Sequence, residues 1–326
     1  MLLNGADPLA IEQAARRLAA GELVALPTET VYGLGARADD DAAVAKIFAA
    51  KGRPADHPLI VHVLDAADAA RFATELPALA LRLMNAFWPG PLTVIVPRAP
   101  AMAGAAAGGQ NSIGLRCPAH PVARALLAAA RAQGVLGVAA PSANRFGRVS
   151  PTRAEHVASE FDADLLVLDG GECAVGIESS IVDCSRGGAV LLRPGVLTAA
   201  QIEAALGQPL QAPDAQAPRA SGTLAAHYAP RATVRLLDAT TLTERLARQL
   251  PLGLAVYSRT VDASRVGGLA RPMPADALAA AQQLFAVLRE LDKAGAQEIW
   301  IELPPQGSEW DGVRDRLTRA AAAFEA

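Results

Sequence analysis

The stretch GELVALPTETVYGLG, residues 21–35, decides the fold of the first part of the chain. Its first seven residues, Gly21–Pro27, form a short apolar run of the kind that makes a buried strand. Two hydroxyl residues and two glycines follow directly. Because glycine lets a backbone approach a ligand closely, we expect a binding loop at the carboxyl end of this strand. The local alternative is an ordinary strand-to-helix connection.

Helices and strands alternate around this stretch. Apolar residues at helical spacing, with start and stop signals, predict helices over Asp41–Ala50, Ala78–Phe87, Val122–Gln133 and Thr198–Leu206. Short apolar runs predict strands over Leu59–Val63, Leu92–Pro97, Ile113–Cys117, Leu136–Ala140, Leu165–Asp169, Ser180–Cys184 and Val190–Arg193. Several strands follow one another directly, so the alternation predicts a mixed α/β sheet rather than a pure βαβ series.

A change of composition after residue 207 predicts a domain boundary. Residues 208–219 hold three prolines and show no apolar period, as in an extended linker. Alternation then restarts and predicts a small parallel sheet with strands at Thr233–Leu237, Leu252–Tyr257 and Glu298–Leu303, and helices at Thr241–Gln249, Asp276–Ala294 and Ser308–Phe324. We therefore expect a first domain over residues 1–207, a linker over 208–231 and a second domain over 232–326.

Composition limits the class of protein. The chain has 326 residues, 52% hydrophobic and 19% charged, with a net charge of −3, so it can build packed cores. Residues 1–207 carry 17 basic and 20 acidic side chains, and the rest carry 13 of each, which argues against a basic nucleic-acid coat. Three cysteines (Cys117, Cys173 and Cys184) without a Cys-x-x-Cys pair argue against a disulfide framework or a structural zinc site. We see no signal peptide or membrane span and expect a cytoplasmic protein.

The common phosphate-binding and hydrolase motifs are missing from the sequence. Two cations, Lys51 and Arg53, instead follow a predicted helix in a loop fixed by glycine and proline. They can address a polyphosphate, or they can simply complement the negative end of the helix dipole. His62 lies inside an apolar strand, where a satisfied core histidine is the commoner outcome. Arg116 ends another strand and needs a partner, either a ligand carboxylate or an acidic side chain of the protein.

Further polar loops follow other strands. They lie at residues 108–112, 141–150, 176–180 and 193–195, and they supply hydroxyls, amides and cations without an evident nucleophile–base pair. Such a surface favours binding and orienting charged substrates over covalent catalysis.

The ordered set of motifs is more specific than its parts. PTETVYGLG, KGRP, LIVHV, WPGPLT, IGLRCP, PSAN, GIESSIVD and LLRPG occur in this order. The set resembles the YrdC-like domain of threonylcarbamoyl-AMP synthases, from about residue 23 to 206. SGTLAAHYAP, residues 221–230, is similar to the SGxxxxHYxP signature of the two-domain long form. The resemblance implies a YrdC-like twisted mixed sheet with helices, plus a small Rossmann-like C-terminal domain.

The resemblance also implies a reaction. Threonine and bicarbonate form a carbamate, whose carboxylate attacks the α-phosphate of ATP to give threonylcarbamoyl-adenylate, pyrophosphate and water. Mg²⁺ accompanies the ATP. A downstream transferase then uses the product to modify an adenosine of certain tRNAs, and whether this chain binds tRNA directly is left open.

The family's motifs, matched residue by residue, imply two groups of contacts. Those implied for threonine are Thr30, His62, Arg116, Ala140 and Ser180. Those implied for ATP are Lys51, Arg53, His57, Ser112, Ser142, Asn144, Ser150, Arg193 and Tyr228, with Lys51 and Arg53 as the catalytic cations. His57 stands where the family motif usually has asparagine. Tyr228 resembles a residue that folds over the ATP site, so we expect the linker to act as a lid, or alternatively to pack only on the second domain.

Two other classes share parts of this pattern. The same domain occurs in carbamoyl-transferring hydrogenase-maturation proteins, but those also carry an acylphosphatase domain and zinc-finger cysteines that this sequence lacks. A double-stranded-RNA or ribosome-binding module is disfavoured by the net charge of −3.

Overall fold

The computed structural model describes residues 1–324, which divide into two compact units. The first unit comprises residues 1–146 and 150–223, and the second comprises residues 147–149 and the described residues from 224 onward. The segment that we expected to be a separate linker, residues 208–231, is therefore divided between the two units after Thr223.

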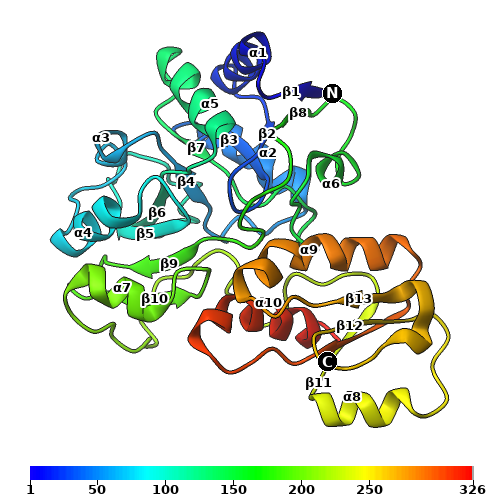
Figure 1. The fold of residues 1–326 in the computed structure, drawn as a ribbon. Helices are drawn as coiled ribbons and strands as arrows, with labels where there is room; N and C mark the ends of the chain where they lie inside the picture. The colour runs from blue at the N-terminus through cyan, green and yellow to red at the C-terminus, as the bar shows by residue number, and fades with distance from the viewer. Residues whose placement is uncertain (325–326) are drawn as a thin grey trace. The chain divides into compact units, whose positions relative to one another are not determined.

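The first unit is built on one mixed sheet, whose strand order is β1-β8-β2-β3-β7-β4-β6-β5-β9-β10 (Figure 1). Parallel pairs such as β4–β6 lie beside antiparallel pairs such as β5–β6, as the sequence predicts. The strands are β1 (Leu2–Asn4), β2 (Val24–Leu26), β3 (Gly33–Arg37), β4 (Ile60–His62), β5 (Leu92–Pro97), β6 (Ser112–Arg116), β7 (Val138–Ala139), β8 (Leu166–Asp169), β9 (Ser180–Asp183) and β10 (Val190–Arg193).

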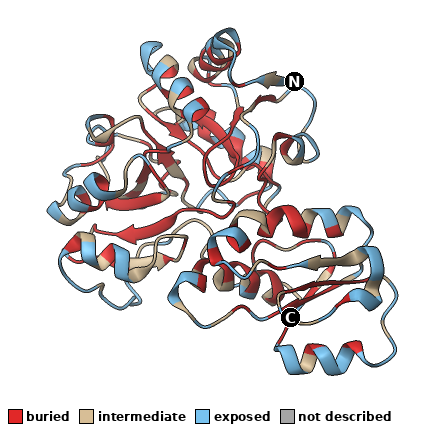
Figure 2. Ribbon diagram, in the orientation of Figure 1, coloured by how far each residue is buried: buried red, intermediate tan, exposed pale blue. Residues whose placement is uncertain are grey.

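Helices cover both faces of this sheet. They are α1 (Pro8–Ala19), α2 (Asp41–Lys51), α3 (Ala66–Ala69), α4 (Ala78–Phe87), α5 (Pro121–Ala132), α6 (Ala154–Ala158) and α7 (Ala199–Leu206). On one face α1 and α5 pack against each other in a cluster with Val24 and Leu26 of β2, and on the other face α2 packs against β3 and α4 against β5, in a cluster that includes Ala25. This alternation along β2 is the period of two that places successive side chains on opposite faces of a strand. Figure 2 shows the buried strands between helices whose outer surfaces are exposed.

The structure confirms most of the predicted elements and corrects one. Helix α4 and strand β5 have the predicted bounds, because the breaker Trp88–Pro91 separates them sharply. The end of the expected binding loop is instead strand β3, which pairs with β2. A Cβ on Gly35 would lie 2.8 Å from Val138 Cγ1, so this glycine serves close strand packing rather than a ligand. Strand β1 and helices α1, α3 and α6 were not predicted.

The second unit contains a four-stranded sheet in the order β11-β14-β12-β13. All of its strand pairs are parallel, which confirms the predicted small parallel sheet, although β13 was not foreseen. Its strands are β11 (Thr233–Leu237), β12 (Leu254–Ser258), β13 (Ala270–Pro272) and β14 (Glu298–Glu302). Its helices are α8 (Ala239–Leu246), α9 (Ala277–Lys293) and α10 (Asp311–Ala322), with 3₁₀ turns η1 (Ser264–Leu269) and η2 (Ser308–Trp310).

Among residues 1–324, no helix combines the length and the apolar character that crossing a bilayer requires. Cys117, Cys173 and Cys184 are all buried and free.

Candidate active site

Three of the five residues expected to bind threonine meet on the sheet of the first unit. His62 and Arg116 are direct neighbours in the parallel pair β4–β6. Nη1 of Arg116 donates a hydrogen bond to Oγ1 of Thr30 over 2.8 Å. Oγ1 of Thr30 is also 2.8 Å from Oγ1 of Thr28. The hydroxyls of the loop after β2 are therefore fixed beside a buried guanidinium.

The other two residues of this group lie on the same part of the sheet. Ala140 directly follows β7, the antiparallel neighbour of β4, and its N–H donates to the carbonyl of Ile60 over 3.0 Å. Ser180 begins β9 and pairs with Leu92 of β5, beside the Thr93–Arg116 pair of β5 and β6. Four of the five residues thus lie on or next to the contiguous strands β7, β4, β6, β5 and β9, and Thr30 lies on the loop after β2.

Arg116 has an acidic partner that the sequence motifs did not single out. Nη2 of Arg116 is 2.7 Å from Oε1 of Glu29, and Oε2 of Glu29 accepts a hydrogen bond from the N–H of Ala119 over 3.0 Å. Both side chains are buried. Burial raises the pKa of Glu29, but the charge of Arg116 and the hydrogen bonds from Arg116, from the N–H of Glu29 itself and from the N–H of Ala119 outweigh this, and the pKa falls below its usual range. In the sequence, only the position of Glu29 between two threonines pointed to this ion pair, and Arg116 lies 87 positions further along the chain.

His62 is neutral in this cluster. Only 3% of it is exposed, and burial together with the charge of Arg116 lowers its pKa to about 3, while Glu29 acts in the opposite direction. Within residues 1–324, Nδ1 of His62 has no hydrogen-bond partner. A buried polar atom without a partner is costly, so this nitrogen is a candidate contact for a bound ligand.

The expected nucleotide residues begin at the end of α2. Nζ of Lys51 donates to the carbonyl of Ser142 over 2.5 Å and also to the carbonyl of Asn144. The structure thus brings Lys51 together with both predicted residues of the loop formed by the PSAN motif, residues 141–144. Burial and the neighbouring charge of Arg53 lower the pKa of Lys51 well below its usual value.

The two arginines of the nucleotide group contact the chain segment that follows the first domain's last helix. Nη2 of Arg53 donates to Oγ of Ser221 over 3.2 Å, and Nη1 of Arg193 donates to the carbonyl of Ser221 over 2.8 Å. The guanidinium of Arg53 also lies over the ring of Phe146, and the ring of His57 meets Phe146 edge-on at 5.4 Å between centroids. Burial, followed by the charge of Arg53, lowers the pKa of His57.

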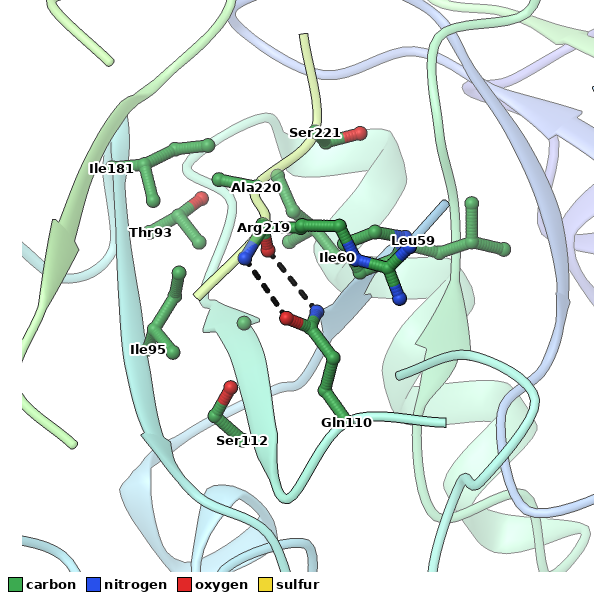
Figure 3. Close-up of a pocket in the computed structure, with 12 residues that line it drawn as sticks. Leu59, Ile60, Thr93, Ile95, Gln110, Ser112, Ile181, Arg219, Ala220 and Ser221 are labelled. Atoms are coloured by element: carbon green, nitrogen blue, oxygen red, sulfur yellow. Dashed lines mark hydrogen bonds between the residues drawn. The ribbon is translucent and has the colours of Figure 1, made fainter. Parts of the chain in front are cut away.

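A pocket lies beside Ser221, between the sheet and residues 219–221 (Figure 3). Thr93, Ile95 and Ser112 line it from the sheet, and the side chain of Ser112 was predicted to contact ATP. Gln110 closes one side through two hydrogen bonds to the main chain of Arg219. The pocket combines an apolar sheet face with a polar rim, but its volume of about 20 Å³ admits little more than a water molecule.

The last two nucleotide candidates lie in different units. Ser150, in the first unit, donates to Oε1 of Glu178 over 2.5 Å. Tyr228 belongs to the second unit, where it stacks on Phe285 at 5.4 Å and lies under the guanidinium of Arg316. Its backbone has φ of 62°, which is unusual for a residue other than glycine. The contact of Tyr228 with ATP stays a prediction.

Comparisons with known proteins agree with this geometry. The family profile described as "Telomere recombination" matches residues 16–195, and the one described as "Threonylcarbamoyl-AMP synthase, C-terminal domain" matches residues 197–322. The chain is 36% identical to the threonylcarbamoyl-AMP synthase of Pyrococcus abyssi over 92% of this chain and 91% of the relative. It is 44% identical to the Bacillus subtilis enzyme of that name over 72% of this chain and 68% of the relative.

A solved structure resembles the whole chain. It is a crystal structure of the Pyrococcus abyssi relative complexed with L-threonine, with a TM-score of 0.88, 34% identity, and coverage of 98% of this chain and 97% of that one. Both units, in their order along the chain, are therefore shared with these relatives. The chain belongs to the threonylcarbamoyl-AMP synthase family.

Proposed function

We propose that this chain makes threonylcarbamoyl-adenylate from L-threonine, bicarbonate and ATP, and that it does so in the cytoplasm as the first step of a tRNA modification. The observation that carries the proposal is the buried Arg116, held beside Thr30 and a neutral His62 on the sheet of the first unit. A guanidinium in this setting can pair with the carboxylate of an amino acid. The Pyrococcus abyssi relative, which was crystallised with L-threonine, supports this choice of substrate.

In the proposed reaction, the amino nitrogen of threonine bonds to the carbon of bicarbonate, and water leaves. One oxygen of the resulting carbamate then attacks the α-phosphorus of ATP, and the bond from that phosphorus to the bridging oxygen of pyrophosphate breaks. Phosphoryl chemistry of this type depends on placing the reactants in line and on neutralising charge. Arg116 would hold the threonine carboxylate, with Thr30, His62, Ala140 and Ser180 around the rest of the molecule.

The cations of the second group would neutralise the triphosphate. Arg53 and Arg193 both donate to Ser221 and so point to a common place, which phosphate oxygens would take over when ATP binds. Lys51 would act there partly through the loop that it holds, because its ammonium group is bound to two carbonyls of that loop. The remaining contacts would come from His57, Ser112, Ser142, Asn144 and Ser150, and the contact of Tyr228 with ATP stays a prediction.

Mg²⁺ would accompany ATP. In residues 1–324, no group of three or more His, Cys, Asp or Glu side chains could hold a metal ion. A magnesium ion on a nucleotide usually needs only one or two carboxylates besides the phosphates. Glu178 fits this need, since its buried carboxylate is bound to Ser150 and acts electrostatically on Lys51. The ion would supply positive charge to the phosphates.

The proposal is tested by measuring pyrophosphate release from ATP. We expect release only when threonine and bicarbonate are both present, and we expect the product to be consumed by a threonylcarbamoyl transferase acting on tRNA. Release that is independent of threonine would contradict the proposed reaction.

Arg116→Lys tests the threonine site within this reaction. An ammonium group cannot pair bidentately with a carboxylate, so threonine affinity should fall far more than ATP affinity. Isothermal titration with each substrate checks this. Equal losses for the two ligands would give Arg116 a structural role instead.

A further inference from the structure

We propose that Glu29 is a positioning residue, which aims the guanidinium of Arg116 at the carboxylate of threonine and thereby sets the affinity for threonine but not for ATP. This inference rests on the proposed function, because it takes Arg116 as the threonine-binding group. Neither the motifs nor the comparisons assign a role to Glu29.

The first argument is the position of Glu29 between three segments. Its backbone belongs to the loop after β2, and its carbonyl accepts a hydrogen bond from the N–H of Val175 over 2.7 Å. One carboxylate oxygen binds Arg116 at the end of β6 over 2.7 Å, and the other binds the N–H of Ala119 over 3.0 Å. The carboxylate is therefore fixed at both ends, and so is the guanidinium that it holds.

The second argument is the set of donors that Arg116 retains. Nε donates to the carbonyl of Gly90 over 3.3 Å, Nη1 donates to Thr30, and Nη2 donates to Glu29. Within the described chain these bonds use one hydrogen on each nitrogen, which leaves one N–H on each of the two terminal nitrogens. A carboxylate can accept from both terminal nitrogens of a guanidinium at once. Glu29 thus holds Arg116 without using up the donors that a substrate carboxylate needs.

The third argument is that no neutral side chain can replace Glu29. Both of its oxygens accept hydrogen bonds, one from Arg116 and one from Ala119. A glutamine offers only one accepting atom, so its NH₂ group would face an N–H donor at one end. It would also leave the charge of Arg116 buried without an opposite charge, which is costly and favours movement of the guanidinium toward other acceptors.

A purely structural role is the competing interpretation, since Glu29 also ties loops together. The two interpretations differ in the substrate that is affected. Loosened loops would disturb folding and both substrates together, whereas a misdirected guanidinium would weaken threonine binding selectively.

The experiment compares Glu29→Gln and Glu29→Asp with the wild type in the full chain. Threonine affinity is measured by titration calorimetry, KM for threonine and for ATP by pyrophosphate release, and folding by thermal melting. We expect Glu29→Gln to raise KM for threonine at least tenfold and KM for ATP less than twofold. Glu29→Asp keeps the charge on a shorter stem and should recover part of the threonine affinity. Glu12→Gln is the matched control, because Glu12 forms an exposed ion pair with Arg16 on α1, and it should change nothing.

A double-mutant cycle adds a second readout. In the Arg116→Lys background, Glu29→Gln should cause little further loss of threonine affinity, because the group that it positions is already altered. Additive losses would overturn the inference, as would equal effects on both substrates or failure of both Glu29 variants to fold.

Failure of the proposed function would look different. If the wild type does not bind threonine, or if Arg116→Lys leaves threonine affinity unchanged, the assigned threonine site is wrong. If Arg116→Lys weakens threonine binding and Glu29→Gln does not, only the role of Glu29 is wrong.

Discussion

The side-chain amide of Gln110 pairs with the main chain of Arg219 through two hydrogen bonds, of 3.1 Å from Nε2 to the carbonyl and 2.8 Å from the N–H to Oε1 (Figure 3). The amide group thus exchanges two N–H···O bonds with one main-chain residue, as two paired residues of neighbouring antiparallel strands do. The guanidinium of Arg219 adds a 2.6 Å ion pair with Asp56. Residues 219–221 are thus held in place at the pocket. Ser221 accepts hydrogen bonds from Arg53 and Arg193, the two arginines expected to bind phosphate.

Ser221 is expected to compete with ATP for these arginines. In Ser221→Ala, the charged side chain of Arg53 loses one hydrogen bond, and a bond with one charged partner is worth about 1.5–3 kcal/mol. ATP would no longer have to displace it, so we expect ATP to bind roughly ten- to a hundredfold more tightly. Titration of ATP into the variant and the wild type measures the difference. Weaker ATP binding in Ser221→Ala would mean that the hydroxyl contacts the nucleotide instead of competing with it.

Lys51→Ala and Arg53→Ala should both abolish adenylate formation, but for partly different reasons. Arg53 lies on a loop and binds the carbonyl of Pro58, so its removal should disturb folding less than removal of Lys51. Lys51 is 2% exposed and binds two carbonyls of the PSAN loop. Its removal leaves buried acceptors unsatisfied and should lower the free energy of unfolding by about 1–3 kcal/mol.

Pyrophosphate release and urea unfolding of the two variants check this difference. Near-normal turnover in both would contradict the nucleotide assignment. An equal free energy of unfolding in the Lys51→Ala and Arg53→Ala variants would show that Lys51 does not hold the PSAN loop.

His62 should make the stability depend on pH. Its pKa is 6.5 when unperturbed and about 3 in the folded chain. The unfolded imidazole therefore binds a proton that the folded one rejects, and the free energy of unfolding falls as the pH drops from 6.5 toward 3. Between pH 6.5 and 5 the loss from this group should be about 1–2 kcal/mol.

Urea unfolding at these two pH values tests the expectation with His62→Gln as the comparison. Gln cannot titrate, so between pH 6.5 and 5 the free energy of unfolding should fall by about 1–2 kcal/mol less in the variant than in the wild type. Parallel pH profiles for the variant and the wild type would show that His62 is protonated in the folded chain.

Local patterns predicted the elements whose ends are marked in the sequence. The cluster Trp88–Pro91 separates α4 from β5, and both have the predicted bounds. Strand β3 was missed because Gly33 and Gly35 indicate flexibility in isolation, and only the neighbouring strand shows why glycine is needed there.

The sequence motifs predicted the individual residues of the site. Their partners could not be predicted, because they depend on the path of the chain in three dimensions. Arg116 was expected to need either a ligand or an acidic residue; the structure shows Glu29, 87 positions away, and leaves donors for a ligand as well. The contacts of Ser221 with Arg53 and Arg193 likewise span 168 and 28 positions.

The final prediction concerns the expected lid. Residues 208–223 belong to the first unit, and Gln110 is one of their side-chain anchors at the pocket. If this segment opens to admit ATP and closes over the intermediate, then Gln110→Leu should favour the open form, because leucine cannot pair with the main chain of Arg219. Trypsin cuts after arginine, and the side chain of Arg219 is 52% exposed, so cleavage after Arg219 reports opening. We expect faster cleavage in Gln110→Leu than in the wild type, slower cleavage of the wild type with ATP and threonine bound, and more hydrolysed adenylate from the variant. Gln133→Leu, at an exposed position after α5, is the matched control and should behave as the wild type. If the substrates leave cleavage after Arg219 unchanged and Gln110→Leu loses no adenylate to water, the segment is a tether and shields nothing.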